Sequence, residues 1–426
     1  MDVNVADEDS RYMREFVKTI VDTIGPRMPC SKTEAKAAEY IKNELEKTCD
    51  EVAIEPFKCH PGGFLGWIKI DITLVLGSLL IFIVTPFITS LQFILYYVSV
   101  ALNIIAWIIT WKEFFSYQEF VDRIFKERSS QNVVGRINPS GGATRIIAFS
   151  GHHDSAPVYN LLEYLRSPGY AVVIPVGFGI LALWTALSIL TALLSQFAID
   201  VSWFQSVVVI LFIIGIPVFI LLWFFTFSSE RANKVPGAVD NLSAVAVVLG
   251  IGRYLKQHPD LIPAGTEIRL ISFGCEEAGL RGAYRYAARH KEELSKVEFE
   301  LVNMDGIQSA KKFMIMEYEP TTRTAHAHDI AEKIDAAGKK AGINAYRFGV
   351  HTLDRIAAFF TGGTDATAFS KAKLKTCSFG SLDVVKYLNN YHTSRDTPDK
   401  IDDGAIEVSL AICLTYIDTE AKKTAK

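Results

Sequence analysis

The sequence contains few cysteines and no clustered cysteine motif. Six cysteines are spread over 426 residues, and none stands in a Cys-x-x-Cys pair. This pattern excludes the dense disulfide framework of a small secreted domain and favours reduced thiols in the cytosol. The positions are Cys30, Cys49, Cys59, Cys275, Cys377 and Cys413.

Concentrated positive charge is also missing. The formal net charge is −3, and no basic stripe interleaved with aromatic residues appears along the chain. The sequence therefore gives no support to nucleic-acid binding. Residues 1–16 are acidic and polar, without the apolar core of a secretory leader, so we expect no signal peptide.

Charge is absent from one long stretch. Between Ile72 and Trp111 there is no Asp, Glu, Lys or Arg. A helix of that length would rise about 60 Å, roughly twice the hydrocarbon core of a bilayer, so the stretch must fold back. Pro86 and the polar residues 89–92 mark the turn. We predict one membrane-spanning helix near 68–88 and another near 92–112.

A second pair of apolar segments follows at 170–195 and 204–227, and each segment is long enough to span a bilayer. The alternative is a set of buried helices in a soluble core. Four apolar segments of this length favour the membrane. Tryptophans near the segment ends match an aromatic belt: Trp67, Trp107, Trp111, Trp203 and Trp223.

An even number of spans returns the chain to the side on which it began. The two hairpin tips contain no Lys or Arg, whereas basic residues flank the spans on the other side. The positive-inside rule then places the polar bulk in the cytoplasm, with the lipid bilayer as a partner. The flanking residues include Lys58, Lys69, Lys112, Arg123, Lys126, Arg128, Arg166, Arg231 and Lys234.

The remaining polar sequence alternates strand-like and helical segments, which indicates an α/β sandwich interrupted by two membrane hairpins. Helices are predicted at 9–24, 31–47, 239–257 and 277–296, the second opening with a Ser31–Glu34 capping box. Strands are predicted at 51–57, 131–137, 144–151, 267–274, 299–305, 312–318 and 374–380. The predicted division is 1–67, 68–112, 113–168, 169–228 and 229–426, where the second and fourth segments are the hairpins.

The stretch Gly-His-His-Asp-Ser at 151–155 closes an apolar strand. Alternate residues of a strand share a face, so His152 and Asp154 point one way and His153 points the other. A metal-bound imidazole usually donates its second N–H to a carboxylate. We therefore expect His152 to be a ligand and Asp154 to orient it, while His153 packs or faces solvent.

Other acidic and histidine residues follow strand-like or turn segments: Asp240, Glu276, Glu277, Asp305 and His392. Each has an ordinary structural role when taken alone, such as a helix cap or a solvated turn. Together with His152 they supply two histidines and several carboxylates at strand ends, where sites form in open α/β sheets. Such donors suit a pair of divalent metals, zinc first, with Co²⁺ or Mn²⁺ also fitting.

Five stretches give the chain a resemblance to a known family: GHHDS, GAVDNLSAVA, GCEEAGLRGA, VNMDG and YHTSRDTPDKID, in this order. The sequence resembles the M28 family of co-catalytic zinc aminopeptidases. The resemblance implies a three-layer α/β sandwich with a mixed sheet flanked by helices, of the zinc exopeptidase type, to which this chain adds four transmembrane helices. It also implies two zinc ions held by His152, Asp240, Glu277, Asp305 and His392, with Asp240 bridging both ions.

The resemblance assigns further roles near these ligands. Glu276 matches the general base that takes a proton from the attacking water, and Asp154 matches the carboxylate behind the first histidine. Tyr391 matches a tyrosine that helps to stabilise the tetrahedral intermediate, although a packed tyrosine is an alternative. Asp365, in TGGTDATAF, resembles a supporting loop residue.

The expected function is a membrane-embedded aminopeptidase that removes N-terminal residues from peptides. Three alternatives stay open: a glutaminyl cyclase-like acyltransferase with one zinc, a non-catalytic membrane scaffold, and a carboxypeptidase. A carboxypeptidase needs a basic clamp for the terminal carboxylate, for which Arg281 and Arg395 are candidates. The sequence also leaves an oligomer open and does not define the side-chain preference.

Overall fold

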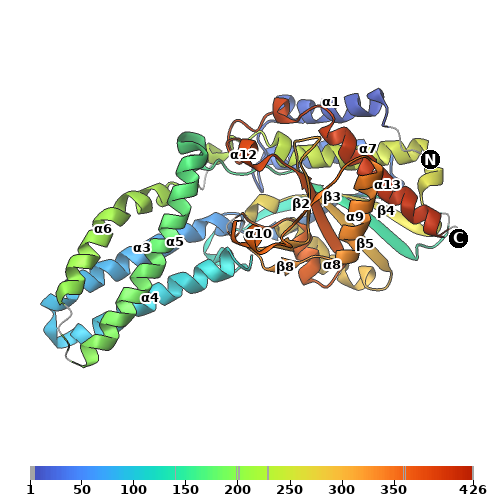
Figure 1. The fold of residues 1–426 in the computed structure, drawn as a ribbon. Helices are drawn as coiled ribbons and strands as arrows, with labels where there is room; N and C mark the ends of the chain where they lie inside the picture. The colour runs from blue at the N-terminus through green and yellow to red at the C-terminus, as the bar shows by residue number, and fades with distance from the viewer. Residues whose placement is uncertain are drawn as a thin grey trace. The chain divides into compact units, whose positions relative to one another are not determined.

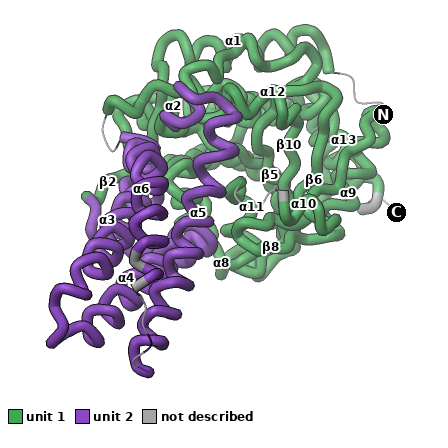
Figure 2. The backbone as a smooth tube through the Cα atoms, turned by 60° about the vertical axis from the view of Figure 1, so that its left-hand side comes forward, with its two compact units in different colours: residues 1–61, 126–158, 229–426 green, residues 62–125, 159–228 purple. Residues whose placement is uncertain are grey.

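The structure is a computed structural model that describes residues 5–139, 141–197, 199, 202–227, 230–357, 359 and 361–424. The chain forms two compact units (Figure 2). Unit 1 comprises Met1–Pro61, Lys126–Val158 and Ser229–Lys426, and unit 2 comprises Gly62–Phe125 and Tyr159–Ser228. Each unit is therefore assembled from segments that are distant in the sequence.

Unit 1 is built around a mixed sheet that has eight strands among the described residues, in the order β1-β2-β4-β3-β5-β10-β6-β9. The central strands β4, β3, β5 and β10 are parallel to one another, and β1 and β2 run antiparallel at one edge. The strands are β1 Glu51–Cys59, β2 Arg128–Ile137, β3 Arg145–His152, β4 Thr266–Phe273, β5 Glu298–Ile307, β6 Phe313–Met316, β9 Tyr346–Phe348 and β10 Thr376–Ser381. A separate pair joins β7 Tyr318–Glu319 to β8 Thr324–Ala325.

Helices cover both faces of this sheet (Figure 1). One face carries α1 Asp7–Thr23, α2 Lys32–Leu45, α7 Ser243–Gln257, α9 His328–Lys340 and α13 Ala405–Thr424. The other face carries α8 Arg281–Leu294 and α11 Ala366–Lys371. The predicted three-layer sandwich with a mixed sheet is confirmed. Short helices α10 Thr352–Ala357 and α12 Val384–Tyr387 lie in the connecting segments.

Strand β3 shows why the apolar sequence forms a central strand. All eight of its residues are buried. Ile147 and Phe149 enter the larger core on one face, while Ile146 and Ala148 enter the core under α8 on the other. Because both faces are covered, the strand is continuously apolar rather than alternating.

The predicted capping box at α2 is half right. Ser31 caps the helix by accepting a hydrogen bond from the Glu34 N–H at 3.0 Å. The Glu34 carboxylate does not return the bond to Ser31; it accepts from the N–H groups of Cys30, at 2.8 Å, and Cys275, at 3.0 Å. The buried Glu34 thus serves long-range contacts that a local motif does not reveal.

Two predicted elements are shorter than expected. The predicted helix 277–296 begins only at Arg281, because Gly279 and Leu280 take φ values of 92° and 62° and end the turn before it. The predicted strand 312–318 divides into β6 and β7. In both places the backbone changes direction within a segment whose sequence pattern predicts one continuous element.

Unit 2 consists mainly of helices: α3 Gly63–Val84, α4 Gln92–Glu113, α5 Asn160–Gln196 and α6 Ser202–Trp223. Arg166, at φ 61°, interrupts α5. Neutral polar contacts join these helices inside the unit. Ser78 and Ser99 share a hydrogen bond of 2.8 Å between α3 and α4, and Asn103 donates to Ser188 of α5 at 3.1 Å.

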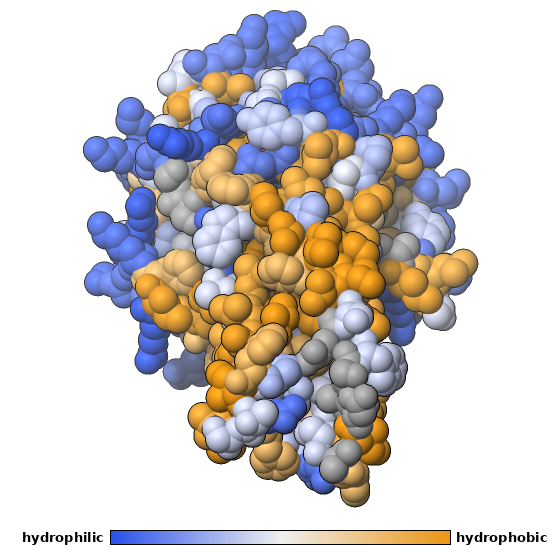
Figure 3. Space-filling model, turned by 90° about the vertical axis from the view of Figure 1, so that its left-hand side faces the viewer, coloured by the Kyte–Doolittle hydropathy of each residue, from blue (hydrophilic) through white to orange (hydrophobic). Residues whose placement is uncertain are grey.

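Five helices among the described residues are long and apolar enough to cross a membrane, one more than predicted from the sequence. Four lie in unit 2, where large apolar side chains are exposed, among them Leu80, Phe93 and Ile213 (Figure 3). The fifth, Ala238–Gln257, contains α7, and 94% of its most apolar 18-residue window is buried within the structure. Its apolar character is therefore that of a core helix.

Candidate metal centre

Three neighbouring strands place acidic and histidine side chains at one edge of the sheet in unit 1. His152 ends β3, Glu276 and Glu277 follow the end of β4, and Asp305 lies near the end of β5. The three strands are parallel and adjacent in the order β4-β3-β5, so their carboxyl ends meet. This edge is the usual position of a site in an α/β sheet.

Asp240 comes from the turn Ala238–Leu242, immediately before α7. Gly237 begins this turn with φ +59°, and a Cβ atom there would lie 2.6 Å from Ser155 Cβ and 2.7 Å from the Asp240 carbonyl oxygen. Only glycine fits such a position without a backbone shift. The turn is held from the other side by Asp396, whose carboxylate accepts from the N–H groups of Val239 and Asp240 at 3.0 and 3.1 Å.

His392 comes from the segment before α13 and adopts a left-handed φ of 51°. Cys275, directly before Glu276, also has a left-handed φ of 55°. Such values are uncommon for residues other than glycine and cluster at functional sites. Both unusual backbone conformations therefore occur at or directly beside a candidate site residue.

The predicted ligand atoms converge on Asp240. Its Oδ1 lies 3.1 Å from His152 Nε2, and its Oδ2 lies 3.3 Å from His392 Nε2. His392 Nε2 is also 3.2 Å from Glu277 Oε1. Two sets of three donor atoms that share Asp240 lie within 4.8 Å of one another: His152, Asp240 and Asp305, and Asp240, Glu277 and His392. A third such set comprises His152, Glu276 and Glu277.

Glu276 lies beside this cluster, with its Oε2 3.8 Å from His152 Nε2. Its side chain is largely buried, while Asp240 occupies the position between the two histidines. The Glu276 carboxylate therefore lies next to His152, whereas Asp240 is the carboxylate that lies between His152 and His392.

Asp154 holds the site from behind. Its Oδ1 lies 3.5 Å from His152 Nδ1, and its backbone oxygen lies 3.2 Å from the same nitrogen. The two carboxylate oxygens also accept the N–H groups of Glu276 and Glu277 at 3.1 and 3.0 Å. Asp154 therefore fixes the first histidine and the acidic pair together, which the sequence pattern alone did not indicate.

His153 faces away from the cluster, as strand alternation requires. It is fully buried, and its Nδ1 lies 2.9 Å from Ser272 Oγ. Burial lowers the pKa of this imidazole to about 4. His153 is thus a neutral packing residue, and of the two predicted alternatives, packing and solvent exposure, the structure shows packing.

The electrostatics of the cluster favour bound cations. Burial raises the pKa values of Glu276, Glu277 and Asp305, and neighbouring carboxylates raise them further. Burial opposes protonation of His392, but Glu277 and Asp240 outweigh it and raise this pKa to about 9. So many acidic groups in a buried space repel one another unless positive charge is present.

The donor set fits zinc. Two imidazole nitrogens and several carboxylate oxygens are ligands that zinc accepts, and His152 has the carboxylate partner typical of a metal-bound histidine. The ligand atoms come from five separate segments, yet all point to one small volume. The residues present therefore meet the requirement for zinc in donor type, convergence and charge.

Two tyrosines lie near His392, and Tyr391 takes the packed arrangement that sequence analysis gave as an alternative. The Tyr391 ring stacks on the His392 ring, with centroids 3.7 Å apart, so it packs against the candidate ligand. Tyr387, which sequence analysis missed, is buried, and its hydroxyl has no hydrogen-bond partner among the described residues. The Tyr387 ring lies with its centroid 5.9 Å from that of Tyr391, so Tyr387 also lies near His392.

Asp365 is a buried carboxylate near the same cluster. Neither of its side-chain oxygens has a hydrogen-bond partner among the described residues. Burial raises its pKa to about 8, and interaction with His152 partly opposes this effect. An orphaned acidic group of this kind is costly unless a cation or ligand satisfies it.

Other supporting residues were not identified from the sequence. Asn241 donates to the Met304 carbonyl at 2.9 Å and accepts from Gly306 N–H at 3.1 Å, which ties the Asp240 turn to β5. Buried Arg27 donates to the carbonyls of His153, at 2.8 Å, and Gly237, at 3.0 Å. These contacts join segments far apart in sequence, so no local signal could have revealed them.

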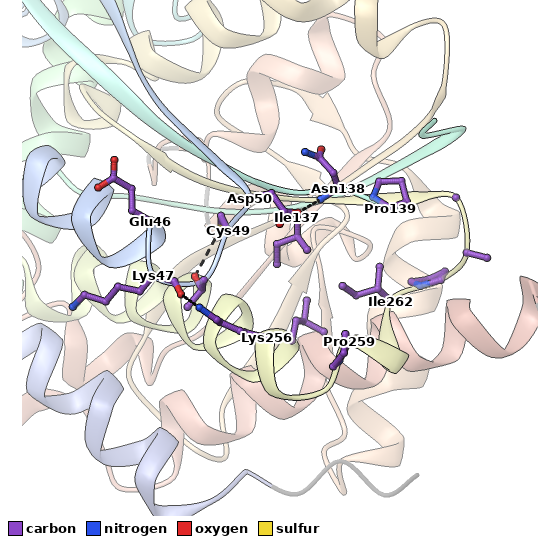
Figure 4. A pocket seen from close by; sticks show the side chains of 15 residues that line it. Glu46, Lys47, Cys49, Asp50, Ile137, Asn138, Pro139, Lys256, Pro259 and Ile262 are labelled. Carbon is purple, nitrogen blue, oxygen red and sulfur yellow. Dashed lines mark hydrogen bonds between the residues drawn. The ribbon is translucent and has the colours of Figure 1, made fainter. Parts of the chain in front are cut away.

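A separate pocket of about 460 Å³ opens at the other end of the strands. It is lined by the turn before β1, the end of β2 and the segment before β4, with Lys47, Asp50 and Asn138 around it (Figure 4). The metal-ligand candidates lie at the opposite ends of β3 and β4. This pocket therefore has no part in the candidate centre.

The sheet, its flanking helices and the donor cluster define a zinc-dependent exopeptidase type of fold. Residues 226–417 match the family model described as Peptidase family M28. The matched region does not include His152. In the sequence, residues 159–228 of unit 2 lie between the segment that contains His152 and the rest of unit 1.

Several individual proteins are similar to this chain. Aminopeptidase YwaD of Bacillus subtilis (strain 168) is 26% identical over 194 residues, which is 45% of this chain and only 39% of that relative. A zinc aminopeptidase structure from Bacillus subtilis has a TM-score of 0.52 at 15% identity, covering 96% of this chain and 94% of the other. A glutaminyl cyclase from Bacteroides thetaiotaomicron has a TM-score of 0.53 at 16% identity, covering 98% and 100%. Structural similarity at these identities shows the fold alone.

Proposed function

We propose that this protein is a zinc-dependent aminopeptidase that hydrolyses the N-terminal residues of peptides. The observation that carries the proposal is the position of Asp240 between two histidines, with one carboxylate oxygen facing each. The relative with aminopeptidase in its name supports the same activity.

Two zinc ions suit this geometry better than one. His152, Asp240 and Asp305 would hold one ion, and Asp240, Glu277 and His392 would hold the other. Each set contains one histidine nitrogen and carboxylate oxygens, so neither ion needs the ligands of the other apart from the shared Asp240. Two divalent cations would also offset the repulsion among the buried acidic groups.

Hydrolysis needs both activation of the carbonyl group and transfer of a proton, and Glu276 is suited to the proton transfer. Zinc ions, when bound, supply Lewis acidity that polarises the scissile carbonyl group and makes water a better nucleophile. The Glu276 carboxylate accepts the proton of the attacking water and passes it to the leaving amine. Burial raises the Glu276 pKa, which brings it nearer the range in which a carboxyl group both accepts and donates protons.

Positioning residues keep this arrangement in place. Asp154 holds His152 and both glutamate N–H groups, and Asp396 holds the Asp240 turn. Buried Tyr387, and Tyr391 on His392, are the nearby aromatic hydroxyl groups available to the substrate oxygen. Of the two, Tyr387 has the hydroxyl that lacks a hydrogen-bond partner among the described residues.

The aminopeptidase direction is favoured over a carboxypeptidase. A carboxypeptidase needs a basic clamp, but Arg281 is buried and donates to the Gly279 carbonyl at 3.1 Å. Arg395 donates to the Asn389 carbonyl at 2.7 and 2.9 Å. Both guanidinium groups thus bind backbone carbonyl groups, so neither residue supports a clamp for a terminal carboxylate.

We also propose that the helices of unit 2 cross a lipid bilayer in four spans, with the peptidase domain in the cytoplasm. The exposed apolar side chains of these helices and their length support this placement. Retention of the protein in membranes after alkaline carbonate extraction is the expected result. Release into the soluble fraction would argue against insertion.

The peptidase proposal is tested with the full chain purified in detergent and loaded with zinc. The protein is incubated with a mixture of unmodified peptides, and mass spectrometry follows their masses over time. Glu276→Gln is assayed in parallel, with Glu292→Gln as a matched control because Glu292 lies on exposed helix surface. A ladder of N-terminal losses in the wild type and control, absent from Glu276→Gln, is expected.

Other outcomes redirect the proposal. A C-terminal ladder would indicate a carboxypeptidase, and loss of ammonia or water from N-terminal Gln or Glu would indicate a cyclase. Unchanged peptides together with bound zinc would contradict general peptidase activity. Equal activity of wild type and Glu276→Gln would remove Glu276 from the mechanism.

A further inference from the structure

Three cysteines that are far apart in sequence meet inside unit 1. Cys30 lies between α1 and α2, Cys59 ends β1, and Cys275 follows β4. Their sulfur atoms are 3.5 Å apart for Cys30–Cys59, 3.3 Å for Cys30–Cys275 and 3.5 Å for Cys59–Cys275. The three sulfurs thus form a nearly equilateral triangle.

This triangle is a separate donor set from the histidine and carboxylate cluster. Cys59 and Cys275 are buried, Cys30 is partly buried, and Phe57 and Ala278 pack around them. An apolar surrounding with three converging thiols suits a soft cation, because thiolate ligands select such metals. All three cysteines are free rather than disulfide bonded.

The dimensions of the triangle fit one metal ion. A triangle with these sides has its centre about 2.0 Å from each sulfur. An ion about 1.2 Å out of the plane would then lie about 2.3 Å from all three sulfurs, which is the usual zinc–sulfur distance. The site therefore needs little rearrangement to bind.

Backbone contacts position two of the three cysteine segments. Glu34 holds two of the cysteine segments by accepting the N–H groups of Cys30 and Cys275. The same carboxylate thus fixes the backbone at two of the three cysteines, Cys30 and Cys275.

We propose that Cys30, Cys59 and Cys275 form a thiolate site for one soft cation of the Zn²⁺ or Cu⁺ class. The ion joins the segment before α2, the end of β1 and the turn that carries Glu276 and Glu277. It acts as a clamp on that turn, since Cys275 is the residue directly before Glu276. The proposal does not depend on peptidase activity.

The test uses the full chain in detergent, stripped of metal and titrated with Cd²⁺ alone. Sulfur-to-cadmium charge-transfer absorbance in the ultraviolet reports only thiolate ligands, so the histidine and carboxylate cluster gives no such signal. One equivalent of Cd²⁺ is expected to produce this absorbance in the wild type. The signal should be lost in Cys59→Ser and in Cys30→Ser.

Two control variants show whether the signal comes from this triangle. Cys49→Ser should keep the signal, because Cys49 packs near Thr48 and Gly135 and not at the triangle. Asp240→Ala should also keep it, which makes failure of this proposal distinguishable from failure of the peptidase proposal. Circular dichroism of each variant checks that loss of signal is not loss of fold.

Two results would overturn the proposal. One is an absorbance that is absent from the wild type or unchanged in both Cys59→Ser and Cys30→Ser. The other is a disulfide between two of the three cysteines, found by thiol counting in denaturant, since the native protein would then contain a redox pair instead of a metal site.

Discussion

The two units use polar groups in opposite ways. Unit 1 buries many charged side chains and gathers acidic and histidine residues at one sheet edge. Unit 2 exposes most of the large apolar side chains found on the described surface, and its helices are joined by neutral contacts such as Ser78–Ser99. Buried charge requires partners, whereas exposed apolar surface requires an apolar surrounding. We therefore expect the catalytic groups to lie in unit 1, and we expect unit 2 to contact an apolar surrounding.

If the catalytic groups lie in unit 1, substitution of Asp240 should cause the largest loss of bound zinc and of activity. Asp240→Ala removes the oxygens that face His152 and His392, so both donor sets lose a ligand. We expect loss of most bound zinc and of measurable peptide hydrolysis, determined by elemental analysis and by turnover. Asp260→Ala, an exposed position in the same unit, is the control. Zinc content equal to that of the wild type would contradict the assignment.

Glu276→Gln should separate chemistry from metal binding. Gln keeps the size of the side chain and leaves the N–H contact to Asp154 intact, but it cannot accept the proton of water. Turnover should fall by about 10²- to 10⁴-fold, the usual contribution of a general base, while zinc content is retained. Steady-state kinetics with metal analysis of the same samples measure both quantities. Parallel loss of metal and turnover would mean that Glu276 is a ligand instead.

A smaller effect is expected at Asp396, which contacts the Asp240 turn through backbone N–H groups. Asp396→Asn replaces one oxygen that accepts from Val239 or Asp240 with a donor group. Zinc affinity or activity should fall by about 10- to 100-fold, as for other residues that position ligands. Competition with a chelator measures the affinity, and Asp399→Asn, which contacts Thr397 and Lys400, is the control. An unchanged affinity would show that the turn does not need this brace.

The smallest effect is expected in unit 2. Asn103→Leu removes the hydrogen bond from α4 to Ser188 of α5. If these helices cross a membrane as proposed, such a contact contributes about 0.6 kcal/mol on average, so the stability change should stay below about 1 kcal/mol. Denaturation in detergent measures stability, and zinc content and turnover should not change. A large loss of activity would mean that the two units are more closely coupled than their chemistry suggests.

Strand positions and most of the candidate site could be predicted from the sequence. Continuous apolar runs marked β3 and β4, and alternation correctly separated His152 from His153. The residues that support the site could not be predicted. Asp396, Asn241 and Arg27 form hydrogen bonds to segments that are distant in sequence and that only the fold brings near. The same holds for the three cysteines, whose spacing from residue 30 to residue 275 carries no motif.

Hydropathy alone does not distinguish a membrane-spanning helix from a buried core helix, as α7 shows. The segment Ala238–Gln257 is apolar enough to span a membrane, yet 94% of its most apolar 18-residue window is buried in the structure. Its sequence resembles that of a membrane helix because it packs against α1, α13 and the sheet on several sides. The helices of unit 2 differ from it in exposure more than in composition.

The central claim is that metal ions bind on either side of Asp240 in unit 1. Anomalous diffraction at the zinc absorption edge, from crystals of the zinc-loaded full chain, tests this claim most directly. Two peaks are expected, one near His152 and Asp305 and one near Glu277 and His392, with Asp240 between them. The absence of any peak beside Asp240 would contradict the claim.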